Sequence, residues 1–161
     1  GVPRYGVLLA LEVEGEVRVG AAYFPALDEM LAAAAGLGAT WNGRPARVSE
    51  VADIGRATLC YTDVAGFGRS GRGAPFERLC AQVYDRRGWS DAYGYLLVAT
   101  GRAEIMLDPV MNAWDCGPFA VILREAGGFF GDWGGAGTIH GGEALAVNGA
   151  LKDEVLALLA G

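Results

Sequence analysis

The stretch from Asp108 to Gly128 limits most strongly what this chain can fold into. Asp108 and Asp115 flank a short irregular segment, and a nearly all-apolar segment then runs to the glycine pair at 127–128. We predict that a helix begins at Asp115 with Pro118 in its first turn, where a missing N–H costs little. Because such a helix has few polar faces, we expect it to be buried between layers.

The two carboxylates of this stretch each allow two interpretations. A carboxylate at the mouth of a buried helix suits a hard cation or a polar ligand. The same pattern is typical of an ordinary N-cap, in which Asp115 only accepts backbone N–H groups. Asp108 precedes Pro109 and is either a ligand or a turn-forming residue.

Composition excludes several classes of protein. A chain of 161 residues that is 52% hydrophobic can bury a sizeable core and is expected to be one ordered domain. A net charge of −6 argues against a nucleic-acid surface, but bound cations still allow a phosphate substrate. No apolar run is long enough to cross a membrane. Three widely spaced cysteines fit a reducing cytoplasm, where we expect the protein to be.

The hydrophobic pattern changes along the chain. The first 50 residues alternate between strands and turns, with an Asn-Gly hairpin signal at 42–43. From residue 55 on, strands alternate with helices, which predicts a layered α/β (α+β) fold with an antiparallel and a mixed sheet. We interpret the glycine-rich segment 64–74 as a mobile surface loop. The expected strands are 6–13, 17–24, 31–35, 47–49, 57–61, 103–108 and 144–147, and the other expected helices are 75–84, 90–100 and 150–159.

Several motifs together resemble one family. Trp114-Asp115 is followed ten residues later by EAGG at 125–128. SDAYGY at 90–95, LVATGR at 97–102, Asp132-Trp133 and TIHGG at 138–142 accompany this pair. The chain resembles the inositol monophosphatase family over nearly its whole length, and within it the branch that hydrolyses histidinol phosphate.

The resemblance implies a fold, a cofactor and a set of site residues. The fold would be a stack of α/β/α/β/α layers, and the activity Mg²⁺-dependent hydrolysis of a small phosphate monoester. Asp115 would bind Mg²⁺ and lie near the substrate hydroxyls. Asp108 would contact the alcohol part of the substrate. Arg86 matches an arginine near the substrate and the subunit contact, although an exposed arginine is an equally good interpretation.

Asp91 bears on the choice of substrate. Near a helix start it favours the helix dipole and needs no further role. In the inositol-hydrolysing branch a small alanine is typical here. An acidic residue would attract a cationic leaving group, and histidinol carries an amine. His140 is the only histidine, and its glycine-rich surroundings do not favour general-base catalysis.

One part of the family pattern is missing. The DPIDGT signature, which supplies two metal-binding aspartates, does not occur in this chain. We therefore expect a C-terminal portion, in which 1–50 complete an antiparallel sheet and 55–161 form a C-terminal subdomain. The water-activating carboxylates are expected upstream of Gly1. The sheet of residues 6–50 is then expected to expose an apolar face.

Three functions remain open at this point. Histidinol-phosphate phosphatase is the favoured one, in histidine biosynthesis, with this chain inactive alone. An inositol-1-monophosphatase or sugar-phosphate phosphatase is the alternative. A non-catalytic binding module from a truncated family member is an alternative of another class, which the upstream coding sequence would distinguish. Relatives are commonly dimers, so a homodimer is also expected.

Overall fold

The computed structural model describes residues 2–160, and its first strands pair in chain order. We call this antiparallel sheet, β1-β2-β3-β4-β5, sheet A. Asn42 and Gly43, between β4 and β5, both have positive φ, 47° and 75°, as a tight two-residue hairpin turn requires. The strands of sheet A are β1 (Val7–Val13), β2 (Glu16–Phe24), β3 (Glu29–Ala34), β4 (Ala39–Trp41) and β5 (Arg44–Pro45).

The prediction of a strand at residues 47–49 is wrong. The last strand of sheet A is the two-residue β5, and the chain leaves the sheet after it. The backbone N–H of Val48 donates to the carbonyl of Ala126, 3.1 Å away, at the end of a helix. The segment therefore packs its backbone against another layer instead of extending the sheet.

The second half of the chain builds a mixed sheet, sheet B, in the order β7-β6-β8-β10-β9. β6 is parallel to β7 and β8, and β10 is antiparallel to β8 and β9. The mixed sheet confirms the expected fold class, although strands β7 and β9 were not predicted. Its strands are β6 (Thr58–Tyr61), β7 (Asp85–Arg87), β8 (Ile105–Asp108), β9 (Gly128–Gly131) and β10 (Ala144–Asn148), and the short helix η1 (Ile54–Arg56) precedes them.

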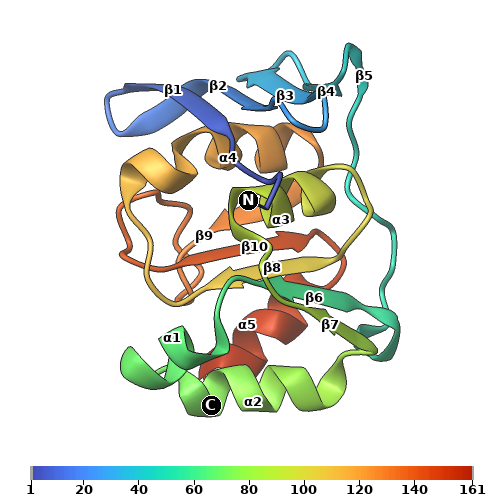
Figure 1. Cartoon of the computed structure of the whole chain (residues 1–161), viewed down its shortest axis with the longest axis vertical. Coiled ribbons are helices and arrows are strands. Elements are labelled where there is room, and N and C mark those ends of the chain that lie inside the picture. Colours follow the sequence, from blue (N-terminus) through green and yellow to red (C-terminus); the bar gives the residue numbers. More distant parts are fainter. Residues whose placement is uncertain (1, 161) are drawn as a thin grey trace.

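Helices separate and cover the two sheets, which gives four layers (Figure 1). α3 (Asp91–Ala99) and α4 (Ala113–Glu125) lie between sheet A and sheet B. The far side of sheet B is covered by α1 (Val64–Arg69), α2 (Gly73–Gln82) and α5 (Lys152–Ala160). None of the helices within residues 2–160 has the length and apolar character that a membrane span needs.

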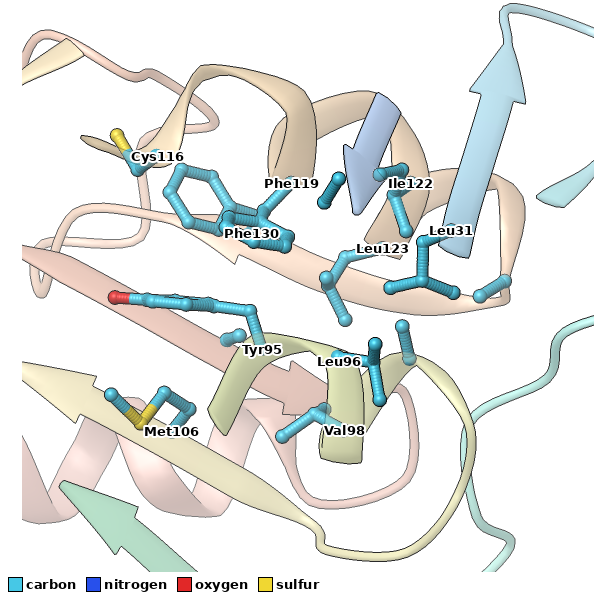
Figure 2. Packing of buried hydrophobic residues seen from close by; sticks show 14 of the residues in the cluster. Leu31, Tyr95, Leu96, Val98, Met106, Cys116, Phe119, Ile122, Leu123 and Phe130 are labelled. Carbon is cyan, nitrogen blue, oxygen red and sulfur yellow. The ribbon is translucent and has the colours of Figure 1, made fainter. Parts of the chain in front are cut away.

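The layer of α3 and α4 contains most of the core. Tyr95 of α3 stacks on Phe119 of α4 with ring centroids 4.8 Å apart, and neither side chain is exposed. Figure 2 shows these two rings among Ile122, Leu123 and Phe130. Because both helices contact both sheets' inner faces, this core ties sheet A to sheet B.

α4 is buried as expected, but it begins earlier than predicted. Asn112 occupies the N-cap position, so Asp115 is the third helical residue and Pro118 lies inside the helix. Pro118 is the sixth residue of α4, past the first turn, so it cannot donate to the carbonyl four residues back and its ring crowds that carbonyl. Sheet A approaches α4 closely here, since a Cβ on Gly20 would lie 2.5 Å from the Pro118 carbonyl oxygen.

The prediction of a mobile glycine-rich loop is also wrong. α1 forms there because the Asp63 carboxylate caps it, accepting from the Ala65 N–H at 3.0 Å. Phe67 anchors the helix, with 1% of its surface exposed and its ring stacked on Phe76 at 3.9 Å. A single buried aromatic side chain thus overrides the glycine content of this segment.

One face of sheet A is apolar and uncovered, as the sequence predicts. Along β1, Val7, Leu9, Leu11 and Val13 are 61, 60, 52 and 44% exposed. The register places Leu9 beside Ala21 of β2, and the same face continues to β3. The opposite face packs on α4, and Figure 1 shows sheet A as an outermost layer. We call this surface the outer face of sheet A.

Candidate active site

The carboxyl ends of the parallel strands of sheet B bring the polar residues together. β6 and β8 pair so that Tyr61 lies opposite Leu107. The next residue of each strand, Thr62 and Asp108, therefore emerges at the same edge. β7 is parallel to β6 on its other side, and Trp89 follows it. Ligands in α/β proteins bind at this edge, because loops diverge there.

Asp108 is a buried carboxylate at the end of β8, with 6% of its surface exposed. The Tyr95 hydroxyl donates to its Oδ2 at 2.8 Å, and Thr62 lines the same cavity as Asp108. Burial raises the pKa of Asp108 to about 6, an effect that the hydroxyl groups of Tyr95 and Thr62 partly offset and the charges of Asp91 and Asp115 increase. Asp108 therefore changes its charge near pH 6.

Asp91 begins α3 after a strained turn. Trp89 and Asp91 both have left-handed φ values, 59° and 46°, which are rare outside glycine. Thr62 holds the turn: its carbonyl accepts from the Trp89 N–H and its hydroxyl oxygen from the Asp91 N–H, each at 3.1 Å. The Asp91 carboxylate is exposed and lines a cavity of about 340 Å³ together with Arg4 and Tyr5. Strain of this kind concentrates at functional sites.

Asp115 lies in the exposed first turn of α4. It is not the N-cap residue, and its Oδ2 accepts from the Asn112 side-chain amide at 3.1 Å. The helix dipole favours a carboxylate at this position. Asp115 and Asp91 lie close enough to Asp108 for their charges to raise its pKa. The structure thus brings three of the four predicted site residues to one edge of the molecule.

The donor set of this chain is suited to magnesium but is not a whole site. Exposed aspartate oxygens are the ligands that Mg²⁺ prefers, and Mg²⁺ keeps several waters, so Asp115 fits as one ligand. Within residues 2–160, no group of three or more His, Cys, Asp or Glu side chains is arranged to hold a metal ion.

A second cavity, of about 300 Å³, opens on the other side of Thr62. Asp108 lines it, as do Asp63 and Arg69, whose carboxylate and guanidinium pair at 2.8 Å. Thr62 lines both this cavity and the one that contains Asp91. The two cavities therefore share one wall.

Arg86 is placed apart from the three carboxylates. It lies on β7, and its positive charge acts on Cys80 of α2, whose pKa is raised by burial and partly lowered by Arg86. It lines neither cavity. His140 pairs with Glu12 of β1 at 2.8 Å. Beside Asp115, burial raises the pKa of Cys116 to about 12, so this thiol stays protonated.

Sequence reasoning missed Thr62, Tyr95 and Trp89. Tyr95 looks like an ordinary core residue in the pattern of α3. Thr62 had a usable signal, because it directly follows a predicted strand and the ends of parallel strands carry ligands. To use that signal one must know that β6 and β8 are parallel neighbours. The structure shows this pairing, but the sequence does not.

Known proteins share both the sequence and the fold of this chain. It is 40% identical over 160 residues to a histidinol-phosphatase of Chlorobaculum parvum, covering 99% of this chain and 62% of that protein. It is 38% identical over 164 residues to a histidinol-phosphatase of Mycobacterium tuberculosis, covering 99% and 63%. The solved structure of the Thermotoga maritima IMPase matches 99% of this chain and 62% of its own, with a TM-score of 0.86 and 30% identity.

The chain spans less than two thirds of the length of these proteins. The model of the inositol monophosphatase family matches residues 1–160. This match agrees with the resemblance carried by the WD and EAGG motifs and with the layered fold. The chain therefore belongs to the inositol monophosphatase family.

Proposed function

We propose that this chain is the C-terminal portion of a Mg²⁺-dependent phosphomonoesterase whose preferred substrate is histidinol phosphate. The observation that carries the proposal is the edge of sheet B, where Asp91, Asp108 and Asp115 gather around the ends of parallel strands in a member of this family. Two similar proteins are histidinol-phosphatases, which favours this substrate. Histidine biosynthesis in the cytoplasm follows as part of the proposal.

The rest of the protein belongs to the same proposal. The similar proteins are longer than this chain, and the outer face of sheet A is apolar and exposed. Both observations support a segment upstream of residue 1 that covers this face and supplies the water-activating carboxylates. A homodimer is also part of the proposal.

Each site residue has a chemical role in this scheme. Bound Mg²⁺, with Asp115 among its ligands, would neutralise the phosphoryl oxygens and activate a water. Asp108 accepts a hydrogen bond from the alcohol part of the substrate, and the hydroxyl groups of Tyr95 and Thr62 orient its oxygens. Asp91 attracts the substrate amine from the adjoining cavity. Arg86 lines neither cavity. Its proposed role is therefore at the subunit contact, from which it would act near the substrate.

Two other functions are supported by specific observations. The Thermotoga maritima IMPase shares the fold at 30% identity, which favours inositol phosphate or a related sugar phosphate as the substrate. The incomplete metal donor set within residues 2–160 favours a non-catalytic module that binds an anion or a protein partner. Both use the same surface and differ in whether phosphate is released.

A phosphate-release assay tests the function. We expect the longest form of the protein that its gene encodes to hydrolyse histidinol phosphate in the presence of Mg²⁺ and to lose activity with a chelator. The 161-residue chain alone is expected to release no phosphate, because its carboxylates do not complete a metal site. Turnover by the 161-residue chain would contradict its status as a portion, and no turnover by the longest form would favour the binding module.

The role of Asp91 in substrate choice has a separate test. In the active form, Asp91→Ala is expected to lower kcat/KM for histidinol phosphate by about tenfold to a hundredfold, the value of one charge-assisted hydrogen bond. Inositol phosphate has no amine, so its kcat/KM should change little. Asp153→Ala, an exposed carboxylate of α5, is the control. An equal loss on both substrates would rule out recognition of the amine.

A further inference from the structure

Thr62 lies between the segments that carry Asp91 and Asp108. It follows β6 and lines both cavities, so it forms the wall between them. Its carbonyl accepts from the Trp89 N–H, and its hydroxyl oxygen accepts from the Asp91 N–H, each at 3.1 Å. Asp108 follows the neighbouring strand β8 and lines one of the two cavities with Thr62. One residue is therefore bonded to the Asp91 segment and adjacent to Asp108.

The direction of the bond to Asp91 is fixed by chemistry. A threonine hydroxyl has one hydrogen to donate and lone pairs that accept. The Asp91 backbone N–H can only donate, so the Thr62 oxygen accepts from it. The Thr62 hydrogen is then available to the Asp108 carboxylate in the shared cavity. The Tyr95 hydroxyl donates to the same carboxylate at 2.8 Å.

The bonds to Thr62 stabilise an otherwise unfavourable backbone. The left-handed conformations of Trp89 and Asp91 cost energy unless neighbouring groups hold them. The two bonds to Thr62 are such restraints, and they come from a different strand, which fixes the turn relative to sheet B. Loss of the hydroxyl would free the Asp91 backbone and remove a donor that is available to Asp108.

We propose that Thr62 is a positioning residue that holds the Asp91 backbone in place and sets it relative to the neighbouring Asp108 carboxylate. This positioning role does not depend on which reaction the protein catalyses. The consequence of the role for substrate binding rests on the proposed function, because Asp108 and Asp91 are the residues that would contact the alcohol and amine parts of the substrate.

The 161-residue chain allows a direct test of the positioning by NMR. In Thr62→Val we expect the Asp91 amide to exchange with solvent about tenfold faster, because its acceptor is lost. The pKa of Asp108 should rise by about one unit, because a donor to the charged form is lost. The other groups acting on this carboxylate, Tyr95, Asp91 and Asp115, are unchanged.

Matched variants separate the hydroxyl from packing. Thr62→Ser keeps the hydroxyl and is expected to restore both the slow exchange and the Asp108 pKa. Thr62→Cys, which keeps a weaker donor, should give intermediate values and serves if the valine variant does not fold. Thr58→Val, at the start of the same strand, should change neither reading. The proposal is overturned if Thr62→Val changes neither the exchange rate of the Asp91 amide nor the pKa of Asp108. It is also overturned if Thr62→Ser shifts these two values as much as Thr62→Val does.

Kinetics of the longest encoded form test the consequence for binding. Thr62→Val is expected to raise KM for histidinol phosphate about tenfold with a smaller effect on kcat, since it disturbs two groups that bind substrate. Thr62→Ser should restore most of the KM. An inactive parent protein would contradict the proposed function while the NMR result still decides the positioning role. An active parent whose KM is unaffected by Thr62→Val would contradict the role in binding.

Discussion

Asp108→Asn is expected to stabilise the folded chain by about 2 kcal/mol at pH 7, because the variant no longer buries a charge. In the folded chain the pKa of Asp108 is raised from 3.8 to about 6, so the folded state holds the proton more tightly than the unfolded chain. The contribution of this group to stability is therefore greatest below pH 4 and is lost as the pH rises through 6. Asparagine stays neutral throughout and still accepts from the Tyr95 hydroxyl.

Urea unfolding of both proteins between pH 4 and pH 8 measures the effect. The difference in the free energy of unfolding should be small at about pH 4 and reach its full size above about pH 7. A constant difference at all pH values would contradict the raised pKa. Asp63→Asn is the control with opposite sign, because Arg69 and the Ala65 N–H lower the pKa of Asp63. In the proposed enzyme, Asp108→Asn gains stability at the expense of substrate binding.

The second large effect concerns the outer face of sheet A. We expect the isolated 161-residue chain to self-associate, because β1 presents a row of apolar side chains next to an unpaired strand edge. The pair Leu9→Lys and Leu11→Glu keeps the net charge and removes two of these side chains. Since burying each leucine at an interface contributes about 1.5 kcal/mol, the pair should weaken association about a hundredfold.

Sedimentation at several concentrations measures this association. Both substituted positions are more than half exposed, so folding stability should change little. Leu37→Lys is the control, because Leu37 is 83% exposed but lies in the turn after β3. A wild-type chain that stays monomeric at high concentration would contradict the prediction. If the proposed upstream segment covers this face, the longest encoded form should not associate in this way.

The sequence predicted the layered fold and the order of most of its strands and helices, because apolar runs, alternation and turn signals mark these elements and the motifs resemble one family. It did not predict boundaries that depend on distant contacts. α4 begins at Ala113 instead of Asp115 because its position is set by packing on both sheets. α1 is stabilised by the stacking of Phe67 on Phe76. The glycine-rich sequence around Phe67 gives no sign of this contact.

For the site, the sequence identified the carboxylates but not what holds them. Asp91, Asp108 and Asp115 were predicted from motifs, and the structure gathers them at one edge. Thr62 and Tyr95 contact Asp108 only because two parallel strands and a core helix meet there. Arg86 matched a family position, yet its guanidinium lies by Cys80. Side-chain direction depends on strand pairing, which the sequence did not show for β7.

The order of the layers along the chain has a consequence for synthesis. The strands of sheet A come first, whereas α4, which packs against β1, β2 and β3, comes after most of sheet B has been made. On the ribosome, these strands therefore emerge before α4, and the apolar face that α4 covers in the folded chain stays exposed until the helix has been made. Exposed strands of this kind pair with other chains. The nascent protein is expected to rely on chaperones during this interval, and to rely on them less once α4 has been translated.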